Sequence, residues 1–583
     1  MPPSEFIPRE KVVSLGDLFQ QRVKQTPNTI AFTFYDIKQS RWISYTWVDV
    51  LQHMIAVRNN LAAEKLKADQ PILLVLSNRL EWITIEQAAN SLGIPIIALS
   101  TTESPKSVCD VAESTNSSII FLESDSLWQG IKSNKNITDN CVKIISVNQI
   151  TANHDVTYFS DWLSQFENKK PSQIINVNSD ALATIFFSNN KMKGIMHNHK
   201  SLLNSAHAFL EKIQYSPSTR ILSVTPLGHC VERTSVYYGA MITGANVVFS
   251  QAGDVIIDIR SQSPNILITT PYILECAYKN LLLQNKKFSN MIIQYLDYKN
   301  GLDKKRIKFL FWPLINRHIA KKTKKEFLGS LDLILSYGTA LSKEVLILAD
   351  LMKLPIREAY SVTEAGGIVA LNDLSNNEIF SVGKPLPNIQ LDCSTNGQLS
   401  IQCNSLMRGY WKNELVTNDV LKNDWLNTHD IAQLENGVLY IRGHKKNLIQ
   451  MSNGEKISPN MFEHHLEQDT LFEKVMCFGN KRSKLTLICQ INPSRWLDFL
   501  SRYDIKIKHV KSDFTPKMLS MLYIRINTFL KSLPGHRHID YILPTLNEWT
   551  IDNGLLNDQG RINRLSLEQH YEKEITLLYK NEF

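Results

Sequence analysis

Features that would place the chain among membrane, secreted or repetitive proteins are missing from the sequence. No run of about 18 apolar residues occurs, so we expect no helix that crosses a membrane. The first residues, Met1–Glu5, have neither the basic nor the apolar stretch of a secretory signal. The sequence also has no internal repeat and no low-complexity tract. These absences predict a cytoplasmic globular protein.

Cysteine pairs at metal-binding or redox spacing are also missing. The eight cysteines are scattered, and no two are separated by only two residues. Because zinc sites and redox motifs need closely spaced cysteines, reduced and buried thiols explain this pattern better than disulfides or a zinc site. Three histidine pairs occur without cysteine partners, and we expect them to have surface or core roles. These pairs are His197 and His199, His464 and His465, and His536 and His538.

The composition is that of an ordinary globular protein. The 583 residues are 43% hydrophobic and 21% charged, and the length allows several domains. Apolar residues at helical spacing over Leu15–Thr26 predict a helix, and the continuous apolar run Pro71–Ser77 predicts a buried strand. A helix at 80–92 and a strand at 94–99 follow. This alternation predicts an α/β fold in which helices cover parallel-rich sheets.

The pattern of the sequence changes after Gly437. Short strand patterns and then a mixed α+β segment follow, which predicts a second and smaller domain. We place the boundary near Arg442–Lys446, so that residues 1–442 form the large domain and residues 443–583 the small one. The smaller part has about 140 residues, a common domain size.

Two motifs carry the clearest chemical signal. The first is Ala359–Glu364, with the sequence AYSVTE, and the second is Thr428–Asp430, with the sequence THD, followed by Gly443–Asn447. With other short signatures in the same order, they resemble adenylate-forming enzymes, and long-chain acyl-CoA synthetases in particular. The His-x-x-Glu-Arg element at residues 229–233 indicates the long-chain branch. The resemblance covers almost the whole chain.

The resemblance implies an ATP-dependent ligase. In such enzymes a carboxylate is joined to the α-phosphate of ATP, and a thiol then attacks the acyl-adenylate. By this comparison Tyr360 would stack on adenine, Thr363 would bind phosphate, and Glu364 would hold Mg²⁺ through oxygen ligation. Asp430 would accept hydrogen bonds from both ribose hydroxyls, which requires an ionised carboxylate. The family has glycine where this chain has His429, so we expect the backbone at this turn to differ.

The phosphate loop departs from the family pattern. Such loops are rich in glycine so that backbone N–H groups can approach phosphate oxygens. Here the segment Ser188–Gly194, SNNKMKG, is two residues shorter and has lost both inner glycines. Lys193 and Ser188 remain as candidate phosphate ligands. The shortened loop either still binds ATP, more weakly, or no longer holds phosphate.

Three further positions bear on the reaction. His444 stands where the family has an arginine that reaches ribose or phosphate, and a neutral imidazole lacks that forked set of donors. Lys446 matches the hinge about which the small domain moves between half-reactions, so we expect a mobile domain. The lysine that bridges carboxylate and α-phosphate is replaced by Arg561, which keeps the charge in a larger, planar group. Arg561 is either its replacement or an arginine on an exposed turn.

The resemblance therefore predicts ATP- and Mg²⁺-dependent ligation of a long-chain fatty acid to coenzyme A. His229 resembles the gate residue near the carboxylate, Gly338–Ala340 resembles the lining of the acyl channel, and Tyr272 stands where the family often has arginine. A pseudo-enzyme that binds acyl or nucleotide groups and a ligase that loads a carrier protein are the alternatives. The expected catalytic residues are Glu364, Thr363, Arg561 and His229, and the expected nucleotide-binding or hinge residues are Ser188, Lys193, Tyr360, Asp430, His444 and Lys446.

One segment is strongly basic. Residues 284–325 contain twelve lysines and arginines and two aspartates, mixed with six aromatic residues. Basic residues among large apolar ones suit an anionic membrane surface, where each contributes about 1 kcal/mol. The alternative is a solvated helical face whose apolar side is buried. No recognition motif supports nucleic acid as a partner.

If this basic segment contacts membranes, the protein should bind vesicles that contain anionic lipid and should be released by salt. The physical reason is that salt screens the attraction between the lysines and arginines and the lipid head groups. Co-sedimentation with anionic and with neutral vesicles, at low and at high salt, measures this binding. Equal binding to both lipids, or none to either, would reject the membrane interpretation.

Overall fold

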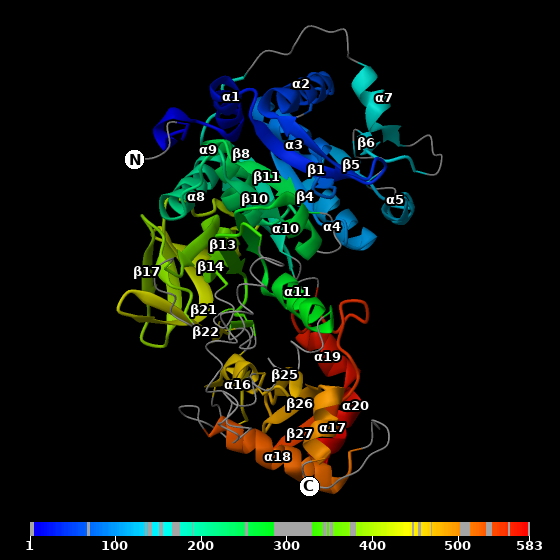
Figure 1. Cartoon of the computed structure of the whole chain (residues 1–583), viewed down its shortest axis with the longest axis vertical. Helices are drawn as coiled ribbons and strands as arrows, with labels where there is room; N and C mark the ends of the chain where they lie inside the picture. The colour runs from blue at the N-terminus through cyan, green and yellow to red at the C-terminus, as the bar shows by residue number, and fades with distance from the viewer. Residues whose placement is uncertain are drawn as a thin grey trace.

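The computed structural model shows a large N-terminal domain and a smaller C-terminal domain (Figure 1). Among the described residues, no helix is long and apolar enough to cross a membrane. The basic segment 284–325 lies outside the described residues except for the backbone of its first residue. The described residues are 5–66, 70–134, 137, 141, 143–150, 156–165, 175–188, 191–250, 255–284, 329–341, 345–346, 349, 354–373, 381–445, 448–452, 456–467, 469–501, 514–531, 539–557 and 560–580.

The first sheet has eight strands in the order β19-β9-β8-β4-β3-β5-β6-β7, and neighbours from β8 to β7 are all parallel. Successive residues of β3 belong to different cores, because Ile72 and Leu74 pack with helix α3 whereas Leu73 and Val75 pack with α4. Two covered faces explain why the strand is apolar throughout. The strands are β3 (Ile72–Val75), β4 (Ile96–Leu99), β5 (Ile119–Leu122), β6 (Lys143–Ser146), β7 (Thr157–Tyr158), β8 (Leu182–Ser188), β9 (Lys191–Asn198) and β19 (Gly409–Tyr410).

The second sheet has nine strands in the order β16-β15-β14-β13-β12-β10-β11-β1-β2. The six strands from β14 to β1 are parallel, and the outer three are antiparallel to their neighbours. The largest core joins residues of both sheets with the helices between them. The strands are β1 (Ile30–Asp36), β2 (Arg41–Thr46), β10 (Arg220–Ser223), β11 (Asn246–Phe249), β12 (Ile266–Thr269), β13 (Leu333–Tyr337), β14 (Ile356–Val362), β15 (Gly367–Leu371) and β16 (Lys384–Pro385).

A third, antiparallel sheet follows in the order β17-β18-β21-β20, with β22 also paired to β21. Its strands are β17 (Gln390–Cys393), β18 (Gln398–Gln402), β20 (Leu421–Lys422), β21 (Trp425–Glu435) and β22 (Val438–His444). The helices described up to this point are α1 (Leu15–Gln25), α2 (Trp47–Ala63), α3 (Leu80–Leu92), α4 (Pro105–Thr115), α5 (Asp125–Ile131), α7 (Phe159–Ser164), α8 (His199–Lys212), α9 (Gly239–Thr243), α10 (Val255–Gln262), α11 (Pro271–Gln284) and α15 (Glu414–Val420).

The C-terminal domain has cores of its own. In its three-stranded sheet, β26 pairs antiparallel with β25 and parallel with β27, and β23 and β24 form a separate pair. Helices α11 and α19 lie where the two domains meet (Figure 1). The elements are β23 (Ile449–Gln450), β24 (Lys456–Ile457), α16 (Pro459–Leu466), β25 (Phe472–Phe478), β26 (Thr486–Ile491), α17 (Pro493–Ser501), α18 (Pro516–Leu530), β27 (Tyr541–Thr545), α19 (Arg564–His570) and α20 (Glu572–Lys580).

The predicted α/β class is confirmed, with parallel-rich sheets in the large domain and a smaller α+β domain. The predicted helix Leu15–Thr26 appears as α1, which ends one residue earlier. Ser14 begins it, because its side chain accepts a hydrogen bond from the Asp17 N–H. The predicted strands at 71–77 and 94–99 appear as the shorter β3 and β4, since pairing with neighbours decides where a strand ends.

Candidate active site

Tyr360 and Asp430 join the second sheet to the third. Tyr360 lies on β14 and Asp430 on β21, and the Tyr360 hydroxyl donates a hydrogen bond to Asp430 Oδ2. Burial raises the pKa of Asp430 to about 6; the Tyr360 hydrogen bond lowers it, the negative Glu364 raises it, and the positive Arg561 lowers it. Asp430 is therefore mostly ionised at about pH 7.

A bulge in β21 presents Asp430. Between the pairs Gln398–Ile431 and Ser400–Asn427, β21 has three residues where β18 has one. The middle residue, His429, has a φ angle of 61°, a left-handed conformation that favours glycine but that histidine also adopts. The structure therefore shows a turn that suits the glycine of the family and is formed here by histidine.

Thr363 and Glu364 lie in a short turn, η5 (Thr363–Ala365), that directly follows β14. Both residues are half-buried. The Tyr410 hydroxyl donates a hydrogen bond to Glu364 Oε1 at 2.9 Å. Among the described residues, no other hydrogen bond to this carboxylate is formed, so the group has room for a further electrostatic partner. Burial is the main cause that raises the pKa of Tyr410, which keeps the phenol as a donor.

The phosphate segment is part of an antiparallel hairpin. Ser188, the last residue of β8, pairs with Lys191, the first residue of β9, and the side chains of both lie outside the described part. Two residues of β9 form a bulge before Gly194, and the second of them is Lys193. The Lys193 Nζ lies 4.7 Å from the centre of the Tyr410 ring. The hairpin therefore brings a lysine to the tyrosine that contacts Glu364.

Arg561 reaches from the C-terminal domain to the large domain. Its Nη2 donates a hydrogen bond to the Gly338 carbonyl at 2.8 Å, just after β13. Arg561 is an exposed residue, as the alternative of an exposed turn expected. Partial loss of hydration beside the large domain lowers the pKa of Arg561, and the negative charge of Asp430 opposes this effect. The preceding Gly560 has a φ angle of 70° and packs on Tyr272 at the start of α11, where a Cβ would lie 2.2 Å from the ring. These contacts hold Arg561 at the junction of the domains.

His444 lies on the strand next to Asp430. His444 is the last residue of β22 and pairs with Asp430 across the strands, and its ring centre lies 6.4 Å from that of His429. Lys446, the expected hinge residue, lies outside the described residues.

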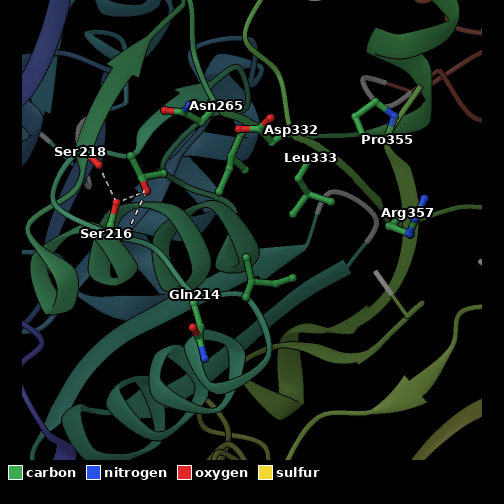
Figure 2. A pocket seen from close by; sticks show the side chains of 11 residues that line it. Gln214, Ser216, Ser218, Asn265, Asp332, Leu333, Pro355 and Arg357 are labelled. Atoms are coloured by element: carbon green, nitrogen blue, oxygen red, sulfur yellow. Dashed lines mark hydrogen bonds between the residues drawn. The ribbon is translucent and has the colours of Figure 1, made fainter. Parts of the chain in front are cut away.

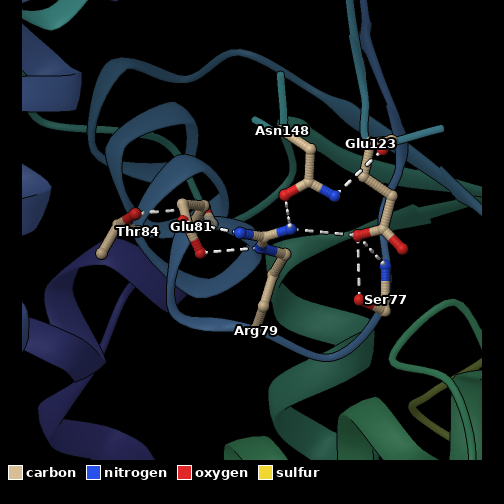
Figure 3. A network of polar contacts seen from close by, with 6 residues as sticks. All are labelled: Ser77, Arg79, Glu81, Thr84, Glu123 and Asn148. Atoms are coloured by element: carbon tan, nitrogen blue, oxygen red, sulfur yellow. Dashed lines mark hydrogen bonds and ion pairs between the residues drawn. The ribbon is translucent and has the colours of Figure 1, made fainter. Parts of the chain in front are cut away.

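The segment that precedes His229 is held by contacts between the two large sheets. The Asn78 side chain donates to the Thr225 carbonyl at 2.7 Å and accepts from the Leu227 N–H at 2.8 Å. The neighbouring Arg79 is fixed by an ionic network with Glu81, Glu123, Asn148 and Ser77 (Figure 3). The segment that leads to His229 is thus anchored to the carboxyl ends of β3, β5 and β6.

A buried carboxyl follows His229. Glu232 is fully buried at the start of a π-helical segment, Glu232–Tyr238, and accepts hydrogen bonds from the hydroxyls of Ser223 and Thr225. Burial raises its pKa to about 8, and these two hydroxyls oppose the shift. The Thr225 hydroxyl also accepts from Tyr337, which precedes Gly338. Glu232 is therefore connected through hydroxyls to the strand end that Arg561 contacts.

Comparison with known proteins decides the family. Residues 19–411 match the family described as AMP-binding enzyme, and residues 446–583 match the AMP-binding enzyme C-terminal domain. The chain belongs to the AMP-binding enzyme family. The resemblance noted from the motifs is thereby confirmed.

Relatives of this AMP-binding enzyme differ in sequence but match almost the whole chain. It is 23% identical to long chain acyl-CoA synthetase 3 of Arabidopsis thaliana, over 98% of this chain and 93% of that protein. It is 20% identical to the chloroplastic long-chain-fatty-acid–[acyl-carrier-protein] ligase AEE15 of Arabidopsis thaliana, over 92% of this chain and 83% of that protein. The crystal structure of the anthranilate CoA ligase AuaEII with anthranoyl-AMP superimposes with a TM-score of 0.73, at 15% identity, over 97% of this chain and 99% of that one.

A separate cavity of about 400 Å³ lies at the amino-terminal ends of strands in the second sheet (Figure 2). Its lining includes Asn265, Leu333 and Arg357, which stand at or next to the first residues of β12, β13 and β14. The candidate active site instead uses the carboxyl ends of the same strands, as is usual in open α/β sheets. This cavity is therefore not part of the candidate active site.

Sequence reasoning did not assign roles to Tyr410, Asn78 or Glu232. Tyr410 is 46 residues from Glu364, and Asn78 is 147 residues from Thr225, so no local spacing connects these partners. His197 was expected to have a surface or core role, and it is fully buried. Its Nε2 lies 2.8 Å from the Thr363 carbonyl, beside the candidate metal residue.

The raised pKa of Glu232 predicts a pH-dependent contribution to stability. From about pH 5 to about pH 8 the folded protein keeps a proton that the unfolded chain has released, so the free energy of unfolding should fall as pH rises. Urea unfolding of the wild type and of Glu232→Gln across this range measures how far the free energy of unfolding falls. This fall should be smaller in Glu232→Gln, which has no carboxyl group to titrate at this position. Glu81→Gln is the control. The pKa of Glu81 is lowered, with Arg79 among the causes, so this carboxylate does not titrate in the same pH range. Parallel pH curves for the wild type and Glu232→Gln would contradict the assignment.

Proposed function

We propose that this AMP-binding enzyme activates a long-chain fatty acid with ATP and transfers the acyl group to coenzyme A through an acyl-adenylate. The proposal rests on one observation above all, the position of Arg561. It extends from the small domain to Gly338 and interacts with Asp430, so a positive charge lies where the nucleotide and the carboxylate would meet. The names of relatives such as long chain acyl-CoA synthetase 3 support the choice of substrate.

The nucleotide roles are proposed from the residues around Asp430. An ionised carboxylate with two oxygens can accept both ribose hydroxyls, and the Tyr360 hydrogen bond orients it. Tyr360 would contact the adenine, and His444, paired with Asp430 across the strands, would lie beside the ribose. His444 has fewer donors than the arginine it replaces, so we expect it to contribute less to binding.

Mg²⁺ fits the Glu364 carboxylate. The carboxylate is a hard oxygen ligand that is only half-buried, and Tyr410 is its hydrogen-bond partner among the described residues. A bound Mg²⁺ would neutralise phosphate charge there. Thr363 in the same turn and Lys193 beside Tyr410 would bind phosphate oxygens, and Ser188 would do so from the end of β8. These groups would act through their positions and charges, because attack of the fatty carboxylate on the α-phosphate needs mainly alignment and neutralisation of charge.

His229 would stand beside the fatty carboxylate, since Asn78 anchors the segment that carries it.

We further propose that residues 1–442 and 443–583 are the moving units, with Lys446 as the hinge. The large-domain core ends at Leu439 and a separate core begins at Ile449, which supports a boundary between them.

A second candidate function is a binding protein without turnover. The observation that favours it is the hairpin at Ser188–Lys191, whose strands pair up to the residues where the family has a glycine-rich loop. In paired strands the backbone N–H groups donate to carbonyls of the partner strand, which leaves fewer N–H groups for phosphate. A third candidate keeps adenylation but uses a carrier-protein thiol, as the name of the relative AEE15 suggests.

Pyrophosphate release tests the function directly. With ATP, Mg²⁺ and a series of fatty acids, the protein should release pyrophosphate only when a fatty acid is present. Adding coenzyme A should then produce acyl-CoA, whereas product on a carrier protein alone would identify the third candidate. Glu364→Ala should abolish release because the metal ligand is lost. Nucleotide binding by calorimetry without any release would establish the binding protein instead.

Arg561→Ala should slow adenylation by about 10²–10³-fold, the usual effect of losing one charged contact in a transition state. Arg561→Lys is the matched variant, since it keeps the charge and has the residue type of the family. Acyl-CoA formation from supplied acyl-adenylate should be unchanged in both variants, because the charge is needed only in the first half-reaction. If Arg561→Ala slows both half-reactions equally, the assignment to adenylation is wrong.

A further inference from the structure

The turn that carries Thr363 and Glu364 is held by its backbone carbonyls. Each of the four carbonyls from Thr363 to Gly366 accepts a hydrogen bond from a donor outside the turn. The donors, in order along the turn, are His197 Nε2 at 2.8 Å, the Met407 N–H at 2.8 Å, Ser405 Oγ at 2.8 Å and Ser205 Oγ at 2.7 Å. The turn therefore has no carbonyl without a partner from another part of the chain.

His197 is the side-chain donor to the carbonyl of Thr363, the candidate phosphate ligand. It is fully buried on β9, and its ring lies edge-on to Phe186 with centroids 5.9 Å apart. A carbonyl can only accept, so Nε2 must carry the proton that is donated to Thr363. Nδ1 then lies 3.0 Å from the Ser201 hydroxyl, whose single proton is shared between this nitrogen and the Asn198 carbonyl at 3.0 Å. Burial lowers the pKa of His197 to about 4, which agrees with a neutral ring in this tautomer.

Strand β9 connects this donor to the phosphate hairpin. Lys193, near its start, contacts the Tyr410 ring, and the Tyr410 hydroxyl donates to the Glu364 side chain. His197, near its end, donates to the backbone of the residue before Glu364. One strand therefore supports the Thr363–Glu364 turn in two ways, directly through His197 on the main chain and indirectly through Tyr410, whose ring Lys193 contacts.

We propose that His197 is a positioning residue for metal-bound nucleotide: its Nε2–H holds the Thr363 carbonyl so that Glu364 and Thr363 face the phosphates. This inference rests on the proposed function. A displacement of about 1 Å in a ligand of this kind is enough to weaken catalysis strongly. Loss of the donor would also leave the Thr363 carbonyl with only the Gly366 N–H of its own turn at 3.0 Å.

Three variants separate positioning from simple packing. His197→Gln keeps a side-chain N–H that can reach the carbonyl, His197→Asn keeps an amide that is too short, and His197→Leu removes the donor. The matched control is His207→Leu, because His207 is a buried histidine on α8 whose Nε2 lies 3.0 Å from the Ile7 carbonyl, away from this turn. Unfolding in urea places all variants on one stability scale.

The first readout is calorimetric binding of ATP at a series of Mg²⁺ concentrations. His197→Leu and His197→Asn should need about tenfold more Mg²⁺ for half-maximal binding, the effect of about 1.4 kcal/mol from one lost hydrogen bond. His197→Gln should stay close to the wild type, and His207→Leu should lose stability without changing the Mg²⁺ requirement. The second readout is hydrogen exchange of the peptide that contains residues 363–366, which should rise in the leucine and asparagine variants only.

Each outcome decides the matter. Faster exchange without a change in Mg²⁺ requirement would reduce His197 to a packing residue and overturn the proposal. Equal Mg²⁺ shifts in His197→Leu and His207→Leu would overturn it as well. A wild type that binds Mg²⁺ and ATP but releases no pyrophosphate would disprove the proposed ligase activity, and the binding series would still test His197.

Discussion

The antiparallel pairing of β9 is the constraint on which the candidate site depends. This strand pairs with β8 on one side and with β19 on the other, so it holds the phosphate hairpin, Tyr410 and His197 in one sheet. A side chain at Gly194 would displace its neighbours on β8, since a Cβ would lie 2.7 Å from the Ile185 side chain and 2.9 Å from the Phe187 ring. The pairing also keeps Lys193 at the ring of Tyr410, whose hydroxyl donates to Glu364, although the glycine-rich loop has been shortened.

Buried polar groups in the interior of the large domain form a connected network beneath the candidate site. Glu86 is almost fully buried and accepts a hydrogen bond from the Tyr238 hydroxyl. Arg233 Nη1 lies 3.8 Å from the Glu86 carboxylate and donates a hydrogen bond to the Thr184 hydroxyl. The Arg233 guanidinium also lies 4.6 Å from the centre of the Phe186 ring. Because breaking such a group leaves a buried charge without its partner, the interior under the site has little freedom to rearrange. Rigid support of this kind suits residues that act by position.

The structure shows how the residues that depart from the family motifs are accommodated. His429 adopts the left-handed backbone that its turn requires, and Arg561 is anchored on Gly338 with Asp430 as its electrostatic partner. The hairpin at Ser188–Lys191 is the larger change, because strand pairing occupies backbone groups that a glycine-rich loop leaves available. The residues proposed for the nucleoside therefore match the family motifs more fully than the residues proposed for the terminal phosphates.

The α/β class, the family and the residue types of the site follow from the sequence by itself. Apolar runs such as Ile72–Val75 indicate buried strands, and the motif residues Tyr360, Glu364 and Asp430 keep their order along the chain. Only the tertiary structure decided which residues support them. Tyr410 and His197 meet the Thr363–Glu364 turn across 46 and 166 residues, and such contacts arise from strand pairing and burial, which leave no periodic trace in a sequence.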